Sequence, residues 1–273
     1  ILFERIRPYE SYPDYGFGMY AFGKSGHEIW RLDVRSEAPP EPLPGLDPEA
    51  HTYLQGLSPD GAFLVLIECH QGRTGLVIYE LATGRLRRPS PVPALSRLGA
   101  HEPVWISDHE LVYAALPEGA QPPDTSIRMA TGRARITLWE AAWRGDTVTA
   151  TEVRNDLTGQ AVAGDLIRLD TRSGKVSHLG NGLHADLSLS PDGRHLAALA
   201  KFRDPWRAER DRARLDSVHH ELRLIDLSTG DIEAPAPGWD VSPGSLAWAA
   251  DSQKLALFAV PQGAPWSSGT HHV

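Results

Sequence analysis

The sequence predicts an all-β protein made of short antiparallel sheets. Three observations support this fold class. A turn motif, Leu-Ser-Pro-Asp-Gly, occurs at residues 57–61 and again at 189–193. An apolar run of five residues, the length of a strand, follows each copy within a few positions. The 25 glycines and 22 prolines among 273 residues indicate many turns and few long helices.

The first copy of the motif begins a unit that can be followed strand by strand. In the turn, proline fixes φ at the second position, aspartate caps the turn locally, and glycine takes the positive-φ position that closes a hairpin. The apolar run 63–67 does not alternate with polar residues, so we expect both faces of that strand to be covered. A break at 70–75, a second run at 76–81 and an Ala-Thr-Gly turn at 82–84 complete the unit.

The same pattern recurs along the chain. Sheets stacked face to face around an axis cover both faces of such strands, so we predict a WD-like β-propeller of four-stranded antiparallel blades. About four to five blades are visible, which indicates an incomplete ring within a single domain spanning residues 1–273. The further copies are 189–193 with 196–200, 222–227 and 228–230; 105–108 with 111–115, 166–170 and 172–174; 248–252 with 255–260; and, more weakly, 18–22 with 29–34.

The spacing of the copies predicts two insertions. The anchors Ser58, Ser107, Ser190 and Ala250 lie 49, 83 and 60 residues apart, whereas a bare blade needs about 40–50 residues. The excess falls at about 117–164 and 203–218, in both cases between the second and third strands of a blade. Because successive loops alternate between the two rims, both insertions leave from the rim opposite the Ser-Pro-Asp-Gly turns. We expect that rim to meet a ligand or partner.

Each insertion has its own pattern. In the first, Ile136, Trp139 and Trp143 are spaced as on a short amphipathic helix, and 147–153 alternates like a strand. In the second, the segment 203–218 is typical of a helix that Asp204 caps. Its five arginines are matched by four acids, which indicates a solvated helix with ion pairs; a docking surface for a partner or a peptide end is the alternative.

Composition excludes several classes of partner and site. The net charge of −8 and the pI of about 5.8 argue against binding to a phosphate backbone. No apolar run approaches the roughly 20 residues that span a bilayer. Cys69 is the only cysteine, which excludes an internal disulfide framework and a cysteine-rich metal site. We therefore expect neither nucleic acid nor a membrane among the partners.

The motifs that carry catalysis are missing from the sequence. There is no Gly-x-Ser-x-Gly, no phosphate-binding glycine loop and no dinucleotide fingerprint. The adjacent pairs His219-His220 and His271-His272 would point to opposite faces of a strand and could not chelate one ion together. We therefore assign no catalytic, cofactor-binding or metal-binding residue, expect no cofactor, and expect the histidines at the surface or on a rim.

The eight tryptophans fall into two groups. Trp30, Trp105 and Trp248 lie in or beside predicted strands and are expected in the core. The tryptophans of insertions and loops are expected to pack these segments onto the ring, with the lining of a central channel as the alternative; they include Trp139, Trp143, Trp206 and Trp266.

The Ser-Pro-Asp-Gly units at 58–61 and 190–193 resemble the propeller repeats of two families. These are the amino-terminal propeller of the prolyl oligopeptidase family of serine peptidases and the periplasmic propeller of the Tol translocation system. Uneven blade spacing and the stretches 103–112 and 114–119 favour the peptidases. The resemblance implies a propeller that gates oligopeptide substrates for a carboxy-terminal α/β-hydrolase domain, which would be the partner of this chain.

That hydrolase domain, with its Ser, Asp and His, is absent from residues 1–273, so no triad residue can be assigned and the chain alone is expected to be inactive. The sequence begins at Ile1 rather than Met, shows no signal-peptide pattern, and ends just after a strand-like run, so we expect a piece of a longer protein. The compartment stays open. The main alternative is a non-enzymatic Tol-type scaffold that binds a protein partner; a metal- or quinone-dependent propeller lacks the acidic and histidine clusters that it would need.

Overall fold

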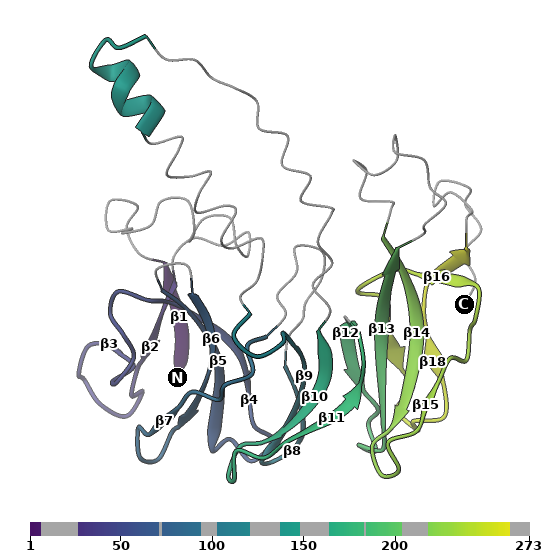
Figure 1. The fold of residues 1–273 in the computed structure, drawn as a ribbon. Coiled ribbons are helices and arrows are strands. Elements are labelled where there is room, and N and C mark those ends of the chain that lie inside the picture. The colour runs from purple at the N-terminus through teal and green to yellow at the C-terminus, as the bar shows by residue number, and fades with distance from the viewer. Residues whose placement is uncertain are drawn as a thin grey trace. The chain divides into compact units, whose positions relative to one another are not determined.

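The computed structural model describes residues 1–6, 27–70, 73–93, 103–120, 137–147, 164–182, 184–203 and 218–262. They belong to two compact units, one built from residues 1–57, 61–92 and 120–160, the other from 58–60, 93–119 and 161–273. Strands β1–β7 lie in the first unit and β8–β19 in the second. Figure 1 shows that strands dominate both. The predicted all-β propeller fold is confirmed.

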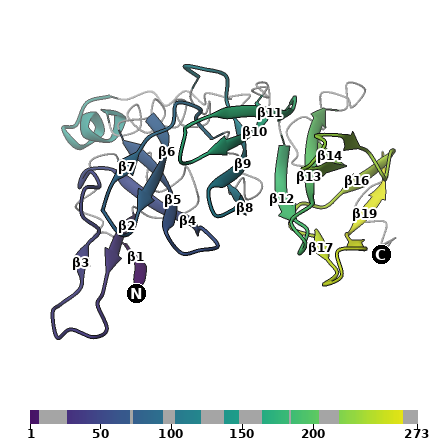
Figure 2. The ribbon, with the colours of Figure 1, turned by 90° about the horizontal axis from the view of Figure 1, so that it is seen from below.

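The first unit contains two antiparallel sheets, which we number as blades 1 and 2 in chain order (Figure 2). Blade 1 has three strands: β1 (Leu2–Ile6), β2 (His27–Arg31) and β3 (Glu41–Pro42). Blade 2 has four: β4 (His51–Leu57), β5 (Phe63–His70), β6 (Arg73–Glu80) and β7 (Leu86–Arg87).

The second unit contains blades 3, 4 and 5. Blade 3 comprises β8 (Val104–Ser107), β9 (Glu110–Ala115), β10 (Asp165–Asp170) and β11 (Val176–Gly180). Blade 4 comprises β12 (His184–Leu189), β13 (His195–Arg203), β14 (Val218–Asp226) and β15 (Ile232–Glu233). In blade 5, β16 (Trp239–Val241) pairs with β19 (Ala259–Pro261), and β17 (Ala247–Trp248) pairs with β18 (Leu255–Ala256).

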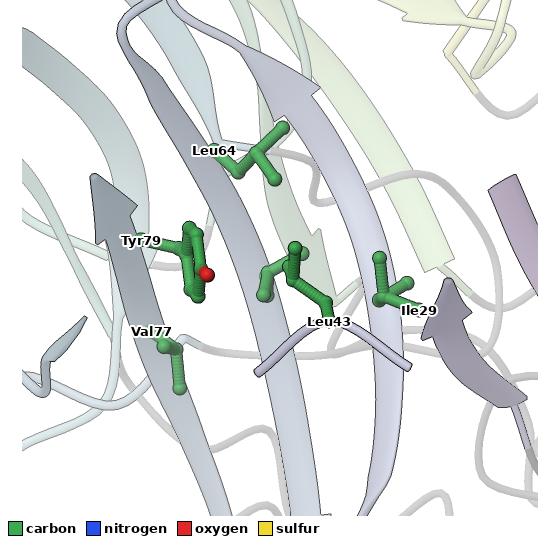
Figure 3. Close-up of a cluster of buried hydrophobic side chains, with 6 residues drawn as sticks. Ile29, Leu43, Leu64, Val77 and Tyr79 are labelled. Atoms are coloured by element: carbon green, nitrogen blue, oxygen red, sulfur yellow. The ribbon is translucent and has the colours of Figure 1, made fainter. Parts of the chain in front are cut away.

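Both faces of β5, the strand predicted at 63–67, are covered. Leu64, Val65, Leu66 and Ile67 are each at most 1% exposed, as the lack of alternation predicted. Leu64 and Leu66 face Ile29 and other residues of blade 1 in a shared cluster, together with Val77 and Tyr79 (Figure 3). The strands of this blade are longer than expected: β5 runs to His70 and β6 starts at Arg73, because backbone pairing continues through the polar pairs Glu68–Gly75 and Cys69–Thr74.

Two further clusters hold the second unit together. Val112 and Leu166 of blade 3 pack against Leu196, Ala198 and Ile225 of blade 4. Ala197, Leu199 and Leu222, on the other face of blade 4, pack against Val241 and Ala259 of blade 5. Each sheet of this unit therefore packs on the next one along the chain, as propeller blades do.

The repeated turns have the conformation that the motif predicts. Gly61 and Gly193 adopt φ values of 71° and 72°. In both copies the serine hydroxyl donates to the carboxylate two residues later, over 2.6 Å from Ser58 to Asp60 and from Ser190 to Asp192. In the degenerate copy of blade 5 the glycine position is taken by Ser252, which still has a φ of 61°.

Candidate functional site

In blades 3 and 4 a long connection joins the second and third strands of the sheet, and in blade 1 a long connection joins β1 and β2, the first two of its three strands. We call the end of a blade from which these connections leave its insertion end; it lies opposite the Ser-Pro-Asp-Gly and Thr-Gly turns. The connections comprise residues 7–26 between β1 and β2, 116–164 between β9 and β10, and 204–217 between β13 and β14. The second insertion is shorter than predicted, because Arg203 and Val218 pair with each other in the sheet.

A buried carboxylate anchors the insertion end of blade 4. Asp240 of β16, only 3% exposed, lies beside the first residues of β14. Its Oδ2 accepts a hydrogen bond from Nδ1 of His219 over 2.8 Å, and its Oδ1 accepts one from the backbone N–H of His220 over 2.9 Å. Both histidines are buried. Asp240 thus ties blade 5 to the residues that follow the second insertion.

His184, the first residue of β12, is also buried at this end. Its Nδ1 lies 2.7 Å from the carbonyl oxygen of Gly182. Burial lowers the pKa of His184 below its ordinary value, outweighing that hydrogen bond, which raises it. At neutral pH the ring is therefore uncharged, so that Nδ1–H donates to the carbonyl.

The first unit has a comparable arrangement at its own insertion end. Glu4 of β1 accepts a hydrogen bond from the backbone N–H of Leu54 on β4 at Oε1, over 2.8 Å. Its Oε2 lies 2.8 Å from Nδ1 of His27, the first residue of β2. The His27 ring is stacked at a tilt near Tyr53, with centroids 5.4 Å apart. One carboxylate thus connects blade 1 to the first strand of blade 2.

These positions correct the expectation for the histidines. His27, His51, His184, His219 and His220 do lie at the insertion ends of their strands, but all five are buried rather than at the surface. A buried polar ring is tolerated where carboxylates and carbonyls accept its hydrogen bonds. For His27, His219 and His220, a position at the start of a strand that follows a long connection was a signal in the sequence for this role. The pairing with distant acids was not.

The arrangement anchors strands, and it has the tautomer-fixing hydrogen bonds that also accompany catalytic or metal-binding histidines. Over the residues that the structure describes, no three His, Cys, Asp or Glu side chains are grouped so that they could hold a metal ion. In the same part of the chain, no helix combines the length and apolarity that crossing a bilayer requires. The hydrogen bonds of Asp240 and Glu4 to the neighbouring blade hold strands of adjacent blades together.

The tryptophans of the first insertion differ from the expectation. A helix forms at 137–143, as predicted, but Trp139 and Trp143 on it are 79% and 93% exposed and do not pack the insertion down. Trp248 is partly buried: it packs at the edge of the cluster between blades 4 and 5, and its Nε1–H donates to the carbonyl oxygen of Ser188. Several expectations lie outside the described residues, namely Trp206, Trp266, His271-His272, most of the strand at 147–153 and the helix at 203–218.

The chain is similar in fold to several solved propellers. They include TolB from Acinetobacter baumannii (13% identity, TM-score 0.43, covering 87% of this chain and 44% of that one). The acylaminoacyl peptidase of Pyrococcus horikoshii is matched at 12% identity and a TM-score of 0.43 (86% and 31%). The β-propeller domain of the trilobed protease from Pyrococcus furiosus is matched at 10% identity and 0.45 (86% and 55%).

The propellers of both families that the sequence motifs resemble thus occur among the matched structures. At these identities the likeness concerns the fold alone. This chain spans less than two thirds of the length of each of the three. No family model and no curated protein matches the sequence.

Proposed function

We propose that this chain is the non-catalytic propeller portion of a serine peptidase of the prolyl oligopeptidase type. It selects oligopeptides for a hydrolase domain that lies outside residues 1–273. One observation carries the proposal. The long connections and the acid–histidine anchors all lie at the same end of the blades, the insertion end. The family part of the proposal is supported by the Ser-Pro-Asp-Gly repeats, which resemble those of peptidase propellers.

The anchors suit a gate. A gate excludes folded proteins only if its opening does not widen under thermal motion. Asp240 holds blade 5 to blade 4 by two hydrogen bonds. Glu4 holds blade 1 to blade 2 by one, from the backbone N–H of Leu54, and is itself bonded to His27 of its own blade. Hydrogen bonds to a charged acceptor are stronger than those between neutral groups. The strand ends that flank the connections are thereby fixed.

In this proposal the two parts of the peptidase divide the work. Bond breaking belongs to the hydrolase domain, whose serine attacks the peptide carbonyl and whose backbone amides stabilise the oxyanion. The propeller controls which molecules reach the serine and binds the oligopeptides that do. Folded proteins are thereby kept away from the serine. In this proposal, no residue of the propeller transfers a proton in the reaction.

One observation favours a second candidate, a scaffold that binds a protein partner. Trp139 and Trp143, one helical turn apart in the first insertion, are almost fully exposed. Large aromatic side chains are enriched at the centres of protein interfaces and are rarely left in water in pairs. A partner that covers this helix would account for them.

The test uses the purified chain. We expect calorimetry to detect binding of blocked hexapeptides but not of a folded protein of similar charge, and we expect no hydrolysis of a chromogenic dipeptide. Peptide binding should persist in the double variant Trp139→Ser/Trp143→Ser. Hydrolysis that a serine-directed phosphonate blocks would contradict the non-catalytic assignment.

The reading frame downstream of Val273 separates the two candidates. A Gly-x-Ser-x-Gly motif within a few hundred codons supports the peptidase. A stop codon within about one blade, together with the absence of peptide binding, supports the scaffold.

A further inference from the structure

Asn181 and Gly182 lie in the short connection between blades 3 and 4. β11 ends at Gly180 and β12 begins at His184. Asn181 is exposed, and Gly182 has a φ of 91°. Theirs is the only asparagine–glycine dipeptide in the sequence. The pairing matters chemically, because a glycine has no Cβ and its backbone can approach other groups closely.

The two groups of this dipeptide that could react with each other are free. Among the residues that the structure describes, none accepts a hydrogen bond from the backbone N–H of Gly182. Within the same part of the chain, the side-chain amide of Asn181 makes no hydrogen bond. A Cβ placed at position 182 would meet nothing within 4 Å, so the space beside the glycine is open. The backbone nitrogen can therefore reach the side-chain amide carbon.

The Asp192-Gly193 dipeptide of blade 4 has the opposite arrangement. The backbone N–H of Gly193 donates to the carbonyl oxygen of Ser190 over 2.8 Å. The Asp192 carboxylate accepts from the Ser190 hydroxyl and from the backbone N–H of Arg194. A nitrogen that is engaged in a hydrogen bond, next to a side chain that is held in place, is poorly positioned to attack it. The fold thus leaves one of these two similar dipeptides reactive and protects the other.

We propose that Asn181 is a site of spontaneous deamidation that leaves isoaspartate in the chain. The backbone nitrogen of Gly182 loses its proton and forms a bond with the side-chain amide carbon of Asn181. The amide nitrogen leaves with that proton as ammonia, and a five-membered succinimide ring remains. Water then opens the ring at either carbonyl carbon, which gives aspartate or isoaspartate. The inference does not depend on the proposed peptidase function.

This connection cannot lengthen without moving a buried contact. In isoaspartate the main chain runs through the former side chain, which adds one methylene group between positions 181 and 182. On one side Gly180 is closely packed, since a Cβ there would lie 3.1 Å from Cδ1 of Ile232. On the other side His184 is only 3% exposed. The added length therefore displaces Gly182, whose carbonyl oxygen lies 2.7 Å from Nδ1 of His184.

Isoaspartate should for this reason weaken the junction between blades 3 and 4. When the carbonyl of Gly182 moves, the buried ring of His184 loses its acceptor, and a buried donor without a partner is costly. The modified connection also carries a carboxylate beside an altered backbone. That group is the substrate of protein isoaspartyl methyltransferases, which provide a specific probe.

Ageing of the purified chain at 37 °C and mildly alkaline pH tests the site. We expect an isoaspartyl methyltransferase to transfer labelled methyl groups to the aged chain, and peptide mapping to place them at residue 181. Labelling there should fall at least tenfold in Asn181→Gln, because glutamine would have to close a larger ring.

The matched control is Asp192→Asn, which creates a second asparagine–glycine dipeptide where the glycine N–H is hydrogen-bonded. In the folded chain, we expect residue 192 to be modified at least tenfold more slowly than residue 181. In guanidinium chloride, where the fold is lost, the two rates should become similar. Far-UV circular dichroism verifies that the variant is folded before ageing.

A second measurement concerns the consequence for His184. Ion-exchange chromatography separates the isoaspartyl form, whose urea midpoint should be lower than that of the fresh chain. Asn181→Asp has the same charge without the added methylene and should keep the midpoint of the fresh chain. In a His184→Gln background the isoaspartyl form should lose less, because the hydrogen bond at issue is already missing.

Three results would overturn the proposal. One is an aged chain that is unmodified at residue 181. Another is an equal rate at residues 181 and 192 in folded Asp192→Asn, which would mean that the fold does not select the site. The third is an isoaspartyl form as stable as Asn181→Asp, which would contradict the displacement of the Gly182 carbonyl.

Discussion

Asp240 accepts a hydrogen bond from the ring of His219 across the boundary between blades 5 and 4, and both side chains are buried. The second carboxylate oxygen accepts from the backbone of His220, so one side chain satisfies two donors that water cannot reach. This relationship fixes the first residues of β14, directly after the second insertion.

Replacing Asp240 by asparagine should therefore be costly. The amide can accept one of the two hydrogen bonds, but its NH2 group then faces the other donor, so we expect Asp240→Asn to lower the free energy of unfolding by about 2–3 kcal/mol. Urea denaturation followed by circular dichroism measures this. The control Glu233→Gln, on the exposed strand β15, should change stability by less than about 0.5 kcal/mol. Equal losses in the two variants would contradict the anchoring role.

The stability of the second unit should fall in mild acid because of His184. Its pKa is lowered by burial, so below the ordinary value of about 6.5 the unfolded chain binds a proton that the folded chain does not. The contribution of His184 is complete above that pH and is lost as the pH falls toward the lowered pKa, with a slope of up to about 1.4 kcal/mol per pH unit.

Denaturation at a series of pH values from 7.5 to 5 measures that slope. His184→Gln should flatten it, whereas His178→Gln, whose side chain is 68% exposed, should leave it as in the unaltered chain. A profile that His184→Gln does not change would mean that other groups cause the acid sensitivity.

The left-handed glycine of the repeated turn should not tolerate a side chain. Gly193 has a φ of 72°, and a Cβ there would meet nothing within 4 Å, so Gly193→Ala isolates backbone strain, worth about 1–2 kcal/mol. Gly75 in β6 also has open space around it but no positive φ. For this reason Gly75→Ala should stabilise the chain by about 0.5–1 kcal/mol. Thermal melts of both variants check the two signs, and a shift in the same direction for both would refute the argument.

The cluster between blades 1 and 2 should be sensitive to truncation. Leu66 is fully buried there, so Leu66→Ala removes apolar contacts and leaves a cavity, at a cost of about 2–5 kcal/mol. Leu57 is 49% exposed, and Leu57→Ala should cost much less. Denaturant titration of the two variants gives the comparison, and similar losses at both positions would speak against a tightly packed cluster.

Local chemistry explains which parts of this fold were predictable. The turns could be read directly, since proline, aspartate and glycine at fixed offsets determine a backbone conformation within four residues. The covered strand 63–67 followed from its unbroken apolar run. The third-strand partners of blades 3 and 4 were found despite the insertions because Thr-Gly and Ser-Gly turns mark their ends.

The rest depended on contacts between residues far apart in the chain. Two blades must pack before Glu4 meets Leu54 or His219 meets Asp240. No local sequence pattern predicts such a pair. The exposure of Trp139 and Trp143 was missed for a related reason: spacing indicates that two side chains share a face of a helix, but not whether anything covers that face.

The pairing of Arg203 with Val218 has a practical consequence for protein engineering. Antiparallel partners hold the two ends of the intervening segment about 5 Å apart, and the entropy of closing a loop grows only slowly with its length. The connection between the second and third strands has two residues in blade 2 and fourteen in blade 4. Foreign sequences grafted between these two positions should therefore be displayed without disturbing the sheet beneath, which makes this chain a carrier for exchangeable recognition segments.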